Sequence, residues 1–127
     1  MYTFHKAERL CSQKLIEELY HSGHRMIVFP YSITWKYYEG DDIQENAQVL
    51  ITTSKRKFHH AVDRNRVKRL TRECYRLHKP TLYEMLTQHQ KKIILSINYI
   101  HTEILSYKQL SKKFDKILIQ LDKELSK

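Results

Sequence analysis

The stretch AVDRNRVKRLTRECYRLHK, residues 61–79, decides the fold because it predicts one long basic helix that the rest of the chain presents. At about 100° per residue, Val67, Leu70, Cys74 and Leu77 fall on one side and form an apolar stripe. We therefore expect a helix that buries this stripe, exposes a basic surface and ends before Pro80. Seven polar side chains, six of them positively charged, cover the rest of its circumference: Arg64, Asn65, Arg66, Lys68, Arg69, Arg72 and Arg76.

Most of the positive charge of the chain lies in this stretch and in the loop before it. The 127 residues include 23 Lys and Arg against 14 Asp and Glu, a net charge of +9. Residues 55–79 hold ten basic and two acidic residues, and the rest of the chain holds thirteen and twelve. Like charges four residues apart destabilise an isolated helix by about 0.2–0.5 kcal/mol per pair. Because a solvated helix face mixes both signs, we expect an external polyanion here, and the composition predicts nucleic acid.

Other parts of the composition exclude several classes of protein. Cys11 and Cys74 form neither a disulfide framework nor a metal motif, and Cys74 on the apolar stripe is expected to be a small core residue. No apolar run reaches the roughly 20 residues that span a bilayer, and the N-terminus lacks a signal-peptide pattern. The eight histidines lack metal-ligand spacing, and the two glycines form no phosphate loop. We expect one soluble cytoplasmic domain over residues 1–127, with no catalytic or metal site of its own.

The N-terminal half predicts a helix followed by strands. Residues 12–22 have an apolar helical face and begin at Ser12, a good N-cap. Residues 26–38 are rich in β-branched and aromatic residues, and Pro30 within them indicates a strand start, an edge or a bulge. A polar turn then precedes a second β-type run, residues 47–53, which we expect to return as a hairpin on the first.

The C-terminal half predicts one more strand and a final helix. Residues 92–101 alternate as a strand, and Ser106 with Gln109 forms a capping box. The order helix, strands, basic helix, strand, helix predicts an α+β sandwich around one small sheet. The final helix has an apolar stripe that we expect to pack on the sheet: Leu110, Phe114, Ile117, Leu118, Leu121 and Leu125.

These residues resemble the signature of the bacterial ribonuclease P protein subunit. The matching motifs are SKR at 54–56, AVDRNRVKRL at 61–70 and RE at 72–73, preceded by RL at 9–10. The length, charge and element order are similar as well, so the resemblance covers nearly the whole chain. It implies one mixed sheet with an unusual left-handed crossover between parallel strands, which no sequence pattern could show.

The resemblance also implies a function. Such a protein binds the catalytic RNA of ribonuclease P and the 5′ leader of precursor tRNA, and it assists Mg²⁺-dependent removal of the leader. The RNA and its Mg²⁺ perform the chemistry, so the chain would have no catalytic or metal residues. We expect no obligate protein partner and no membrane partner. The residues expected to contact the catalytic RNA are Arg64, Asn65, Arg66, Lys68, Arg69 and Arg72. Those expected in a leader cleft between the first helix and the sheet are Tyr20, Tyr31, Thr34, Lys36, Lys55 and Arg56.

Two positions depart from the pattern of the family. Ile16 stands where many members carry a Phe, which makes Tyr20 the better candidate for stacking on a leader base. His59 and His60 replace a frequent Gly-Asn pair, which bears on the backbone shape of the loop. Two other classes remain as alternatives: a structural RNA-binding module, such as a ribosomal or assembly protein, and a DNA-binding helix protein. The DNA-binding reading would need a helix-turn-helix or a dimer interface, and the sequence predicts neither.

Overall fold

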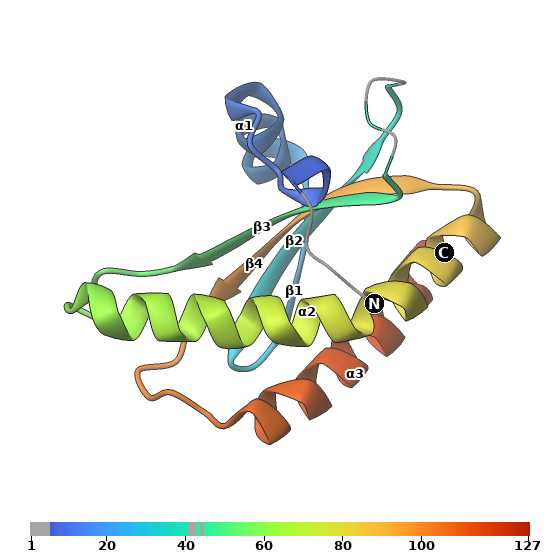
Figure 1. Ribbon diagram of the computed structural model, residues 1–127. Coiled ribbons are helices and arrows are strands. Elements are labelled where there is room, and N and C mark those ends of the chain that lie inside the picture. Colours follow the sequence, from blue (N-terminus) through green and yellow to red (C-terminus); the bar gives the residue numbers. More distant parts are fainter. Residues whose placement is uncertain (1–5, 41–42, 44) are drawn as a thin grey trace.

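The computed structural model describes residues 6–40, 43 and 45–127 (Figure 1). The predicted order of helix, strands, basic helix, strand and helix is confirmed. The elements are η1 (Lys6–Glu8), α1 (Gln13–Ser22), β1 (His24–Val28), β2 (Tyr31–Tyr38), β3 (Ala47–Thr53), α2 (Ala61–His89), β4 (Lys92–Tyr99) and α3 (Tyr107–Leu125).

The strands form one mixed sheet in the order β1-β2-β4-β3. β2 pairs antiparallel with both β1 and β4, whereas β3 and β4 are parallel. The predicted hairpin between residues 26–38 and 47–53 is therefore wrong, because β4 lies between β2 and β3. The basic helix α2 is the connection between the two parallel strands, and the left-handed sense of this crossover stays a prediction.

Residues 26–38 lie in two strands rather than one. Phe29 and Pro30 make the tight turn of the β1–β2 hairpin, so that Val28 pairs with Tyr31. Pro30 has no backbone N–H to donate to a ladder, which explains why it lies between the strands.

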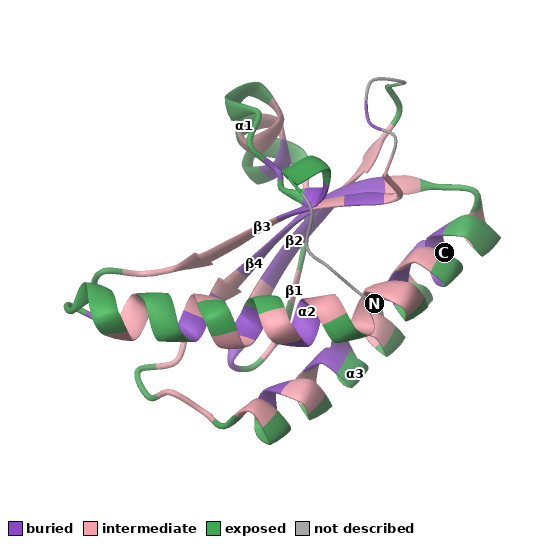
Figure 2. Ribbon diagram, viewed as in Figure 1, coloured by how far each residue is buried: buried purple, intermediate pink, exposed green. Residues whose placement is uncertain are grey.

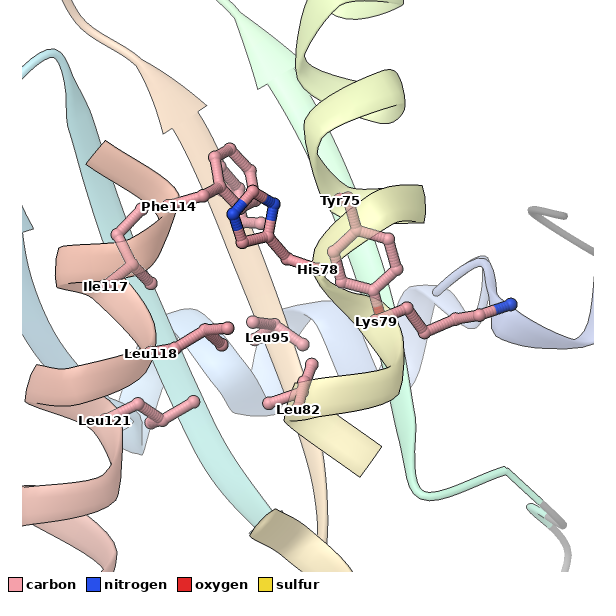
Figure 3. Close-up of a pocket in the computed structure, with 10 residues that line it drawn as sticks. Tyr75, His78, Lys79, Leu82, Leu95, Phe114, Ile117, Leu118 and Leu121 are labelled. Carbon is pink, nitrogen blue, oxygen red and sulfur yellow. The ribbon is translucent and has the colours of Figure 1, made fainter. Parts of the chain in front are cut away.

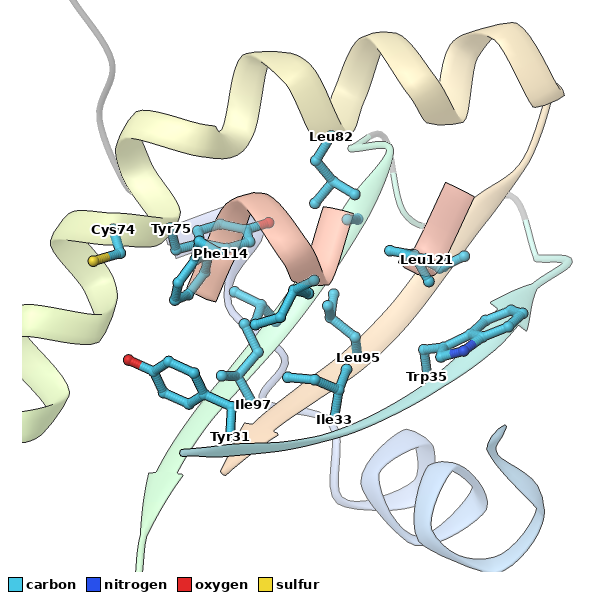
Figure 4. Packing of buried hydrophobic residues seen from close by; sticks show 14 of the residues in the cluster. Tyr31, Ile33, Trp35, Cys74, Tyr75, Leu82, Leu95, Ile97, Phe114 and Leu121 are labelled. Carbon is cyan, nitrogen blue, oxygen red and sulfur yellow. The ribbon is translucent and has the colours of Figure 1, made fainter. Parts of the chain in front are cut away.

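Each face of the sheet carries a helical layer (Figure 1). α2 and α3 cover one face, and α1 packs against β2 and β4 on the other. The sides of α2 and α3 that face the sheet are the buried ones (Figure 2). Beneath them, Tyr31, Ile33 and Trp35 of β2 are buried with Leu95 and Phe114 in the main core (Figure 4). A smaller core lies under α1 and contains Leu10, Leu19, Ile43 and Ile94.

Helix α3 forms as its sequence predicts. The Ser106 hydroxyl oxygen accepts from the backbone N–H of Gln109, and the Gln109 side chain accepts from the backbone N–H of Ser106, which completes the capping box. Of the predicted stripe, Leu118 is half-buried and the other residues are buried: Leu110, Phe114, Ile117, Leu121 and Leu125.

Helix α1 ends in close contact with the sheet. Ser12 caps its start, as predicted, by accepting a hydrogen bond from the N–H of Leu15. At its other end the N–H of Gly23 donates to the carbonyl of Leu19. A Cβ on Gly23 would lie 2.9 Å from Cγ2 of Thr34, so only glycine allows the helix to approach β2 this closely.

Helix α2 continues through Pro80 to His89, so the prediction that it ends before Pro80 is wrong. A proline inside a helix costs roughly 3 kcal/mol and tends to bend it, and the ribbon of α2 changes direction in its yellow part (Figure 1). Leu82 and Leu86, beyond the proline, are fully buried against the rest of the core. Their burial favours continuing the helix and offsets the cost of the lost hydrogen bond.

The buried face of α2 is rotated relative to the predicted stripe. Val67 and Cys74 are buried as expected, but Leu77 is 41% exposed, which contradicts its predicted place in the core. Thr71 is buried instead, and its hydroxyl has a hydrogen-bond partner at 2.8 Å in the hydroxyl of Tyr31. A pattern of apolar residues cannot detect such a polar contact.

The hollow between α2, α3 and β4 is a packing gap rather than a ligand site (Figure 3). Its lining is mainly apolar, with Leu82, Leu95 and Leu121 in it and His78 at its rim, while Lys79 extends away from it. The cavity measures about 10 Å³, which is hardly enough for one water molecule.

Candidate nucleic-acid interface

The basic helix presents its charged residues on the side away from the sheet and along the flank that faces β3. Of the six residues predicted to contact RNA, Asn65, Arg66, Arg69 and Arg72 are exposed, whereas Arg64 and Lys68 are half-buried. The six therefore share one helix surface, but they are not equally accessible. We call the set of Arg64, Asn65, Arg66, Lys68, Arg69 and Arg72 the α2 basic surface.

Arg64 holds the loop that leads into α2. Its Nη1 donates to the backbone carbonyls of Phe58 and His59, at 2.8 and 2.9 Å. The side chain therefore satisfies two acceptors of the loop and places its positive charge at the start of the helix. Among the described non-glycine residues only Gln90 has a positive φ, so the position of His59, where the family often has a glycine, does not require one.

Arg76, next along the same helix, has an acidic partner. Its Nε donates to Oε2 of Glu73 at 3.2 Å. This hydrogen bond lowers the pKa of the Glu73 carboxyl, which stays ionised and offsets the charge of Arg76. The C-terminal end of the basic stretch is therefore less electropositive than the α2 basic surface.

Arg72 lies near the outer edge of β3, where Arg9 forms a β-bridge with Val49. Together with Arg9, Cys11 and Ile51 it lines a hollow of about 150 Å³ beside this edge strand. Two arginines that are 63 residues apart in the sequence thus line one hollow at this edge of the sheet. The hollow extends the positive surface from α2 toward the beginning of α1.

The loop before α2 adds further positive charge. Phe58 is buried in the main core and anchors the loop, while Lys55, Arg56 and Lys57 are exposed. The Ser54 hydroxyl accepts from the backbone N–H of Arg56 at 3.0 Å and fixes the turn. Lys55 and Arg56 were predicted at the mouth of the cleft, and the structure places them directly after the end of β3.

The face of the sheet that carries α1 is only partly covered by that helix. Beyond α1, one row of paired residues crosses all four strands and ends at Ile27, which is 63% exposed. The row consists of Ile27, Ser32, Asn98 and Thr52, and we call it the open strip. Within it the Thr52 hydroxyl donates to Oδ1 of Asn98 at 3.0 Å, which leaves the NH₂ group of that amide for another partner.

Tyr20 lies at the boundary between α1 and the open strip. Its hydroxyl is 2.6 Å from the hydroxyl of Ser96, which is two residues before Asn98 on the same face of β4. The residue is nevertheless 48% exposed. An aromatic ring fixed at its polar end and open to solvent is suited to stack on a nucleic-acid base.

The structure separates the other residues predicted for the cleft. Tyr31 points into the main core on the opposite face of the sheet and is fully buried, so its predicted place in the cleft is wrong (Figure 4). Burial raises the pKa of its hydroxyl far above the usual value. Thr34 faces α1 but is only 7% exposed beneath the end of that helix. Lys36 lines a different hollow, of about 450 Å³, with Glu18 and His24.

Three polar residues of the open strip were missed from the sequence: Ser32, Thr52 and Asn98. Their signal was present, because each is a polar residue within a β-type run, on the side of its strand that faces away from the main core. Polar residues at those positions indicate that the smaller core under α1 does not extend to this end of the sheet.

Within residues 6–40, 43 and 45–127 there is no group of three or more His, Cys, Asp or Glu side chains placed to hold a metal ion. Across the same described residues, no helix is both long and apolar enough to cross a bilayer.

Comparisons with known proteins agree on one family. A family model described as "Ribonuclease P" matches residues 4–122. A "Ribonuclease P protein component" of Porphyromonas gingivalis is 28% identical over 116 residues, which cover 91% of this chain and 84% of that protein.

Solved structures show the same fold. The Staphylococcus aureus RNase P protein superposes with a TM-score of 0.69 at 19% identity, covering 91% of this chain and 96% of that one. The protein from Thermotoga maritima gives a TM-score of 0.69 at 16% identity, covering 87% of this chain and 94% of that one. At these identities the two likenesses establish the α+β fold with its mixed sheet, and the family rests on the sequence matches.

Proposed function

The chain belongs to the ribonuclease P protein family, and from this premise we propose that it is the protein subunit of ribonuclease P, acting in removal of the 5′ leader from precursor tRNA. The observation that carries the proposal is the α2 basic surface on a chain whose family model matches residues 4–122. As a member of this family the chain is a component of an endoribonuclease complex, with ribonuclease P RNA as its partner.

In this proposal the α2 basic surface contacts the catalytic RNA. Arginine suits folded RNA because its planar guanidinium pairs bidentately with phosphate and also stacks on bases. Arg66 and Arg69 are exposed and accessible for such contacts. Asn65 adds a neutral donor and acceptor among the charges.

The leader of the precursor tRNA binds along the open strip. A single strand needs a surface with an aromatic platform, hydrogen-bonding groups and positive charge at its ends. Tyr20 supplies the platform, Asn98 supplies free amide donors, and Lys55 and Arg56 supply the charge. Thr34 and Lys36 contribute indirectly, through the packing of α1 and the charge beyond it, and Tyr31 is excluded by its burial.

The RNA, with its bound Mg²⁺, carries out the hydrolysis. Mg²⁺ prefers phosphate oxygens and water to a cage of protein ligands, so the RNA phosphates would hold it. From this chain, the carboxylate of Asp63 in the first turn of α2 is the group that could contact a hydrated Mg²⁺ beside the α2 basic surface. Its place at the helix N-terminus is also favoured by the helix dipole alone. We place the complex in the cytoplasm, without an obligate protein partner.

The proposal is tested by the affinity of the reconstituted holoenzyme for precursor and mature tRNA. We expect tighter binding of the precursor, with the difference growing as the leader is lengthened from one nucleotide to about five. A matched control is the same precursor with a leader held in a duplex, which cannot enter the open strip. If the leader makes no difference while the chain still binds ribonuclease P RNA tightly, the role in leader binding fails and a structural RNA-binding module is favoured.

A further inference from the structure

The outer side of α3 carries a row of lysines. Lys108, Lys112 and Lys116 follow one another at intervals of four residues, and Lys123 extends the row by two turns. All four are exposed. At about 100° per residue they lie opposite the buried side of the helix, which is centred on Leu121. We call these four lysines the α3 lysine face.

The acidic residues of α3 do not neutralise this face. Oδ1 of Asp115 lies 2.9 Å from Nε2 of His78, and Oδ1 of Asp122 lies 2.9 Å from Nε2 of His89. Both carboxylates are therefore directed sideways, toward α2. Glu124, the third acid of the helix, pairs with Lys127 at 3.4 Å. Within residues 6–40, 43 and 45–127, none of the four lysines of the α3 lysine face forms an ion pair.

Such an arrangement favours a polyanion. Lysines four residues apart repel each other, and no carboxylate of the described chain relieves that repulsion. The rise between successive lysines is about 6 Å, which is comparable to the separation of neighbouring phosphates along a nucleic-acid strand. Lysine is a flexible point charge that pairs with phosphate without reading bases. The face thus fits a phosphodiester backbone.

We propose that the α3 lysine face is a second docking surface for ribonuclease P RNA, in addition to the α2 basic surface. This proposal rests on the proposed function, because it takes the RNA partner from there. α2 and α3 cover the same face of the sheet, whereas the open strip lies on the other face beside α1 (Figure 1). An RNA that lies against α2 can therefore also reach α3, while a leader bound in the open strip cannot.

The first test removes the charges and keeps the helix. In the triple variant Lys108→Gln, Lys112→Gln and Lys116→Gln, three positive charges are lost, and glutamine has a helix propensity close to that of lysine. The matched control removes three exposed lysines elsewhere on the chain: Lys6→Gln, Lys14→Gln and Lys91→Gln. The measurement is the dissociation constant for ribonuclease P RNA as a function of salt concentration.

We expect the triple α3 variant to bind the RNA about tenfold or more weakly at low salt. Its slope of log affinity against log salt should fall by about 2, because each phosphate contact contributes roughly 0.7–0.9. The control should change affinity by less than about threefold. Equal slopes and affinities for the two variants would overturn the proposal.

A second test uses the unmodified protein, so it does not depend on the folding of any variant. Lysines are acetylated with and without bound ribonuclease P RNA and quantified by mass spectrometry. We expect protection of Lys108, Lys112 and Lys116 by the RNA, and full reactivity of Lys14 and Lys91. If Arg66→Ala weakens RNA binding and the α3 lysines stay reactive, only the second surface fails. If the unmodified protein does not prefer ribonuclease P RNA over an unrelated folded RNA, the proposed function itself fails.

Discussion

The guanidinium of Arg64 donates to the backbone carbonyl of Phe58 at 2.8 Å, and this contact joins the basic helix to the loop before it. Phe58 is buried in the main core, so the loop is held from two sides. Arg64 therefore has a structural role in addition to its proposed contact with RNA. The two roles can be separated by comparing Arg64 with Arg66, an exposed residue two positions further along the helix.

Arg64→Ala should weaken RNA binding and also loosen the loop. Two charge-assisted hydrogen bonds are lost from a half-buried side chain, which we expect to lower the free energy of unfolding by about 1 kcal/mol. Arg66→Ala should weaken RNA binding to a similar degree and leave stability unchanged. Urea unfolding and hydrogen exchange of the loop amides measure the difference. Equal stability of the two variants would show that the contact of Arg64 with Phe58 is unimportant in solution.

Tyr20 should act on the leader through its ring rather than its hydroxyl. Tyr20→Ala removes the stacking platform and should reduce the preference for precursor over mature tRNA by roughly tenfold, since a stacked base is worth about 1–3 kcal/mol. Tyr20→Phe keeps the ring and should retain that preference, although it leaves the buried Ser96 hydroxyl without this partner. The ratio of the two tRNA affinities is the measurement. A loss of preference in both variants would assign the effect to the hydroxyl.

Tyr31 should affect stability and not leader binding, although the resemblance to the family implied a place for it in the cleft. Tyr31→Phe leaves the buried Thr71 hydroxyl unpaired and should cost about 1–3 kcal/mol. The double variant with Thr71→Val should cost less than the sum of the two single changes, because both partners of one contact are removed. Urea unfolding of the four proteins completes the cycle. A change in leader preference for Tyr31→Phe would contradict the burial of this residue.

Stability should decrease in alkaline solution. Burial raises the pKa of the Cys74 thiol to about 12 and raises those of the Tyr31 and Tyr75 hydroxyls well above their ordinary value. In the unfolded chain these groups ionise near their ordinary values of 9.0 for cysteine and 10.0 for tyrosine. The free energy of unfolding should therefore be insensitive to these groups below pH 9 and fall as the pH rises from about 9 to 12.

Cys74→Ala should remove the part of that loss of stability that begins near pH 9, and Cys11→Ala, at an exposed cysteine, is the matched control. Urea unfolding between pH 7 and 11 measures both profiles. An identical pH profile for Cys74→Ala and the unmodified protein would contradict the assignment of the thiol.

The helices and the buried sides of the strands could be predicted because they depend on local patterns. The capping box of Ser106 and the alternation of Tyr31, Ile33 and Trp35 are examples, and both are present in the structure. The pairing of β3 could not be predicted, since its partner β4 is separated from it by the whole of α2. The continuation of α2 through Pro80 could not be predicted either, because burial of the residues beyond the proline outweighs the cost of a proline inside a helix.

The candidate site was predictable in part for the same reason. The α2 basic surface follows from the charges on one helix, so its residues are close together in the structure as well. The cleft combines a helix and four strands. A residue of a strand belongs to it only if its side chain points to the face of the sheet that carries α1. Tyr31 and Thr34 point to opposite faces of β2, so one lies in the main core and the other under the end of α1.

The central claim is most directly tested by cleavage of a precursor tRNA with a 5′ leader at low Mg²⁺. The chain alone, the ribonuclease P RNA of the same organism alone, and the two together are compared on one substrate. We predict cleavage at the leader junction only when both are present. Cleavage by the chain alone would contradict the placement of the active site in the RNA, and an absence of stimulation by a chain that binds the RNA tightly would contradict its role in leader removal.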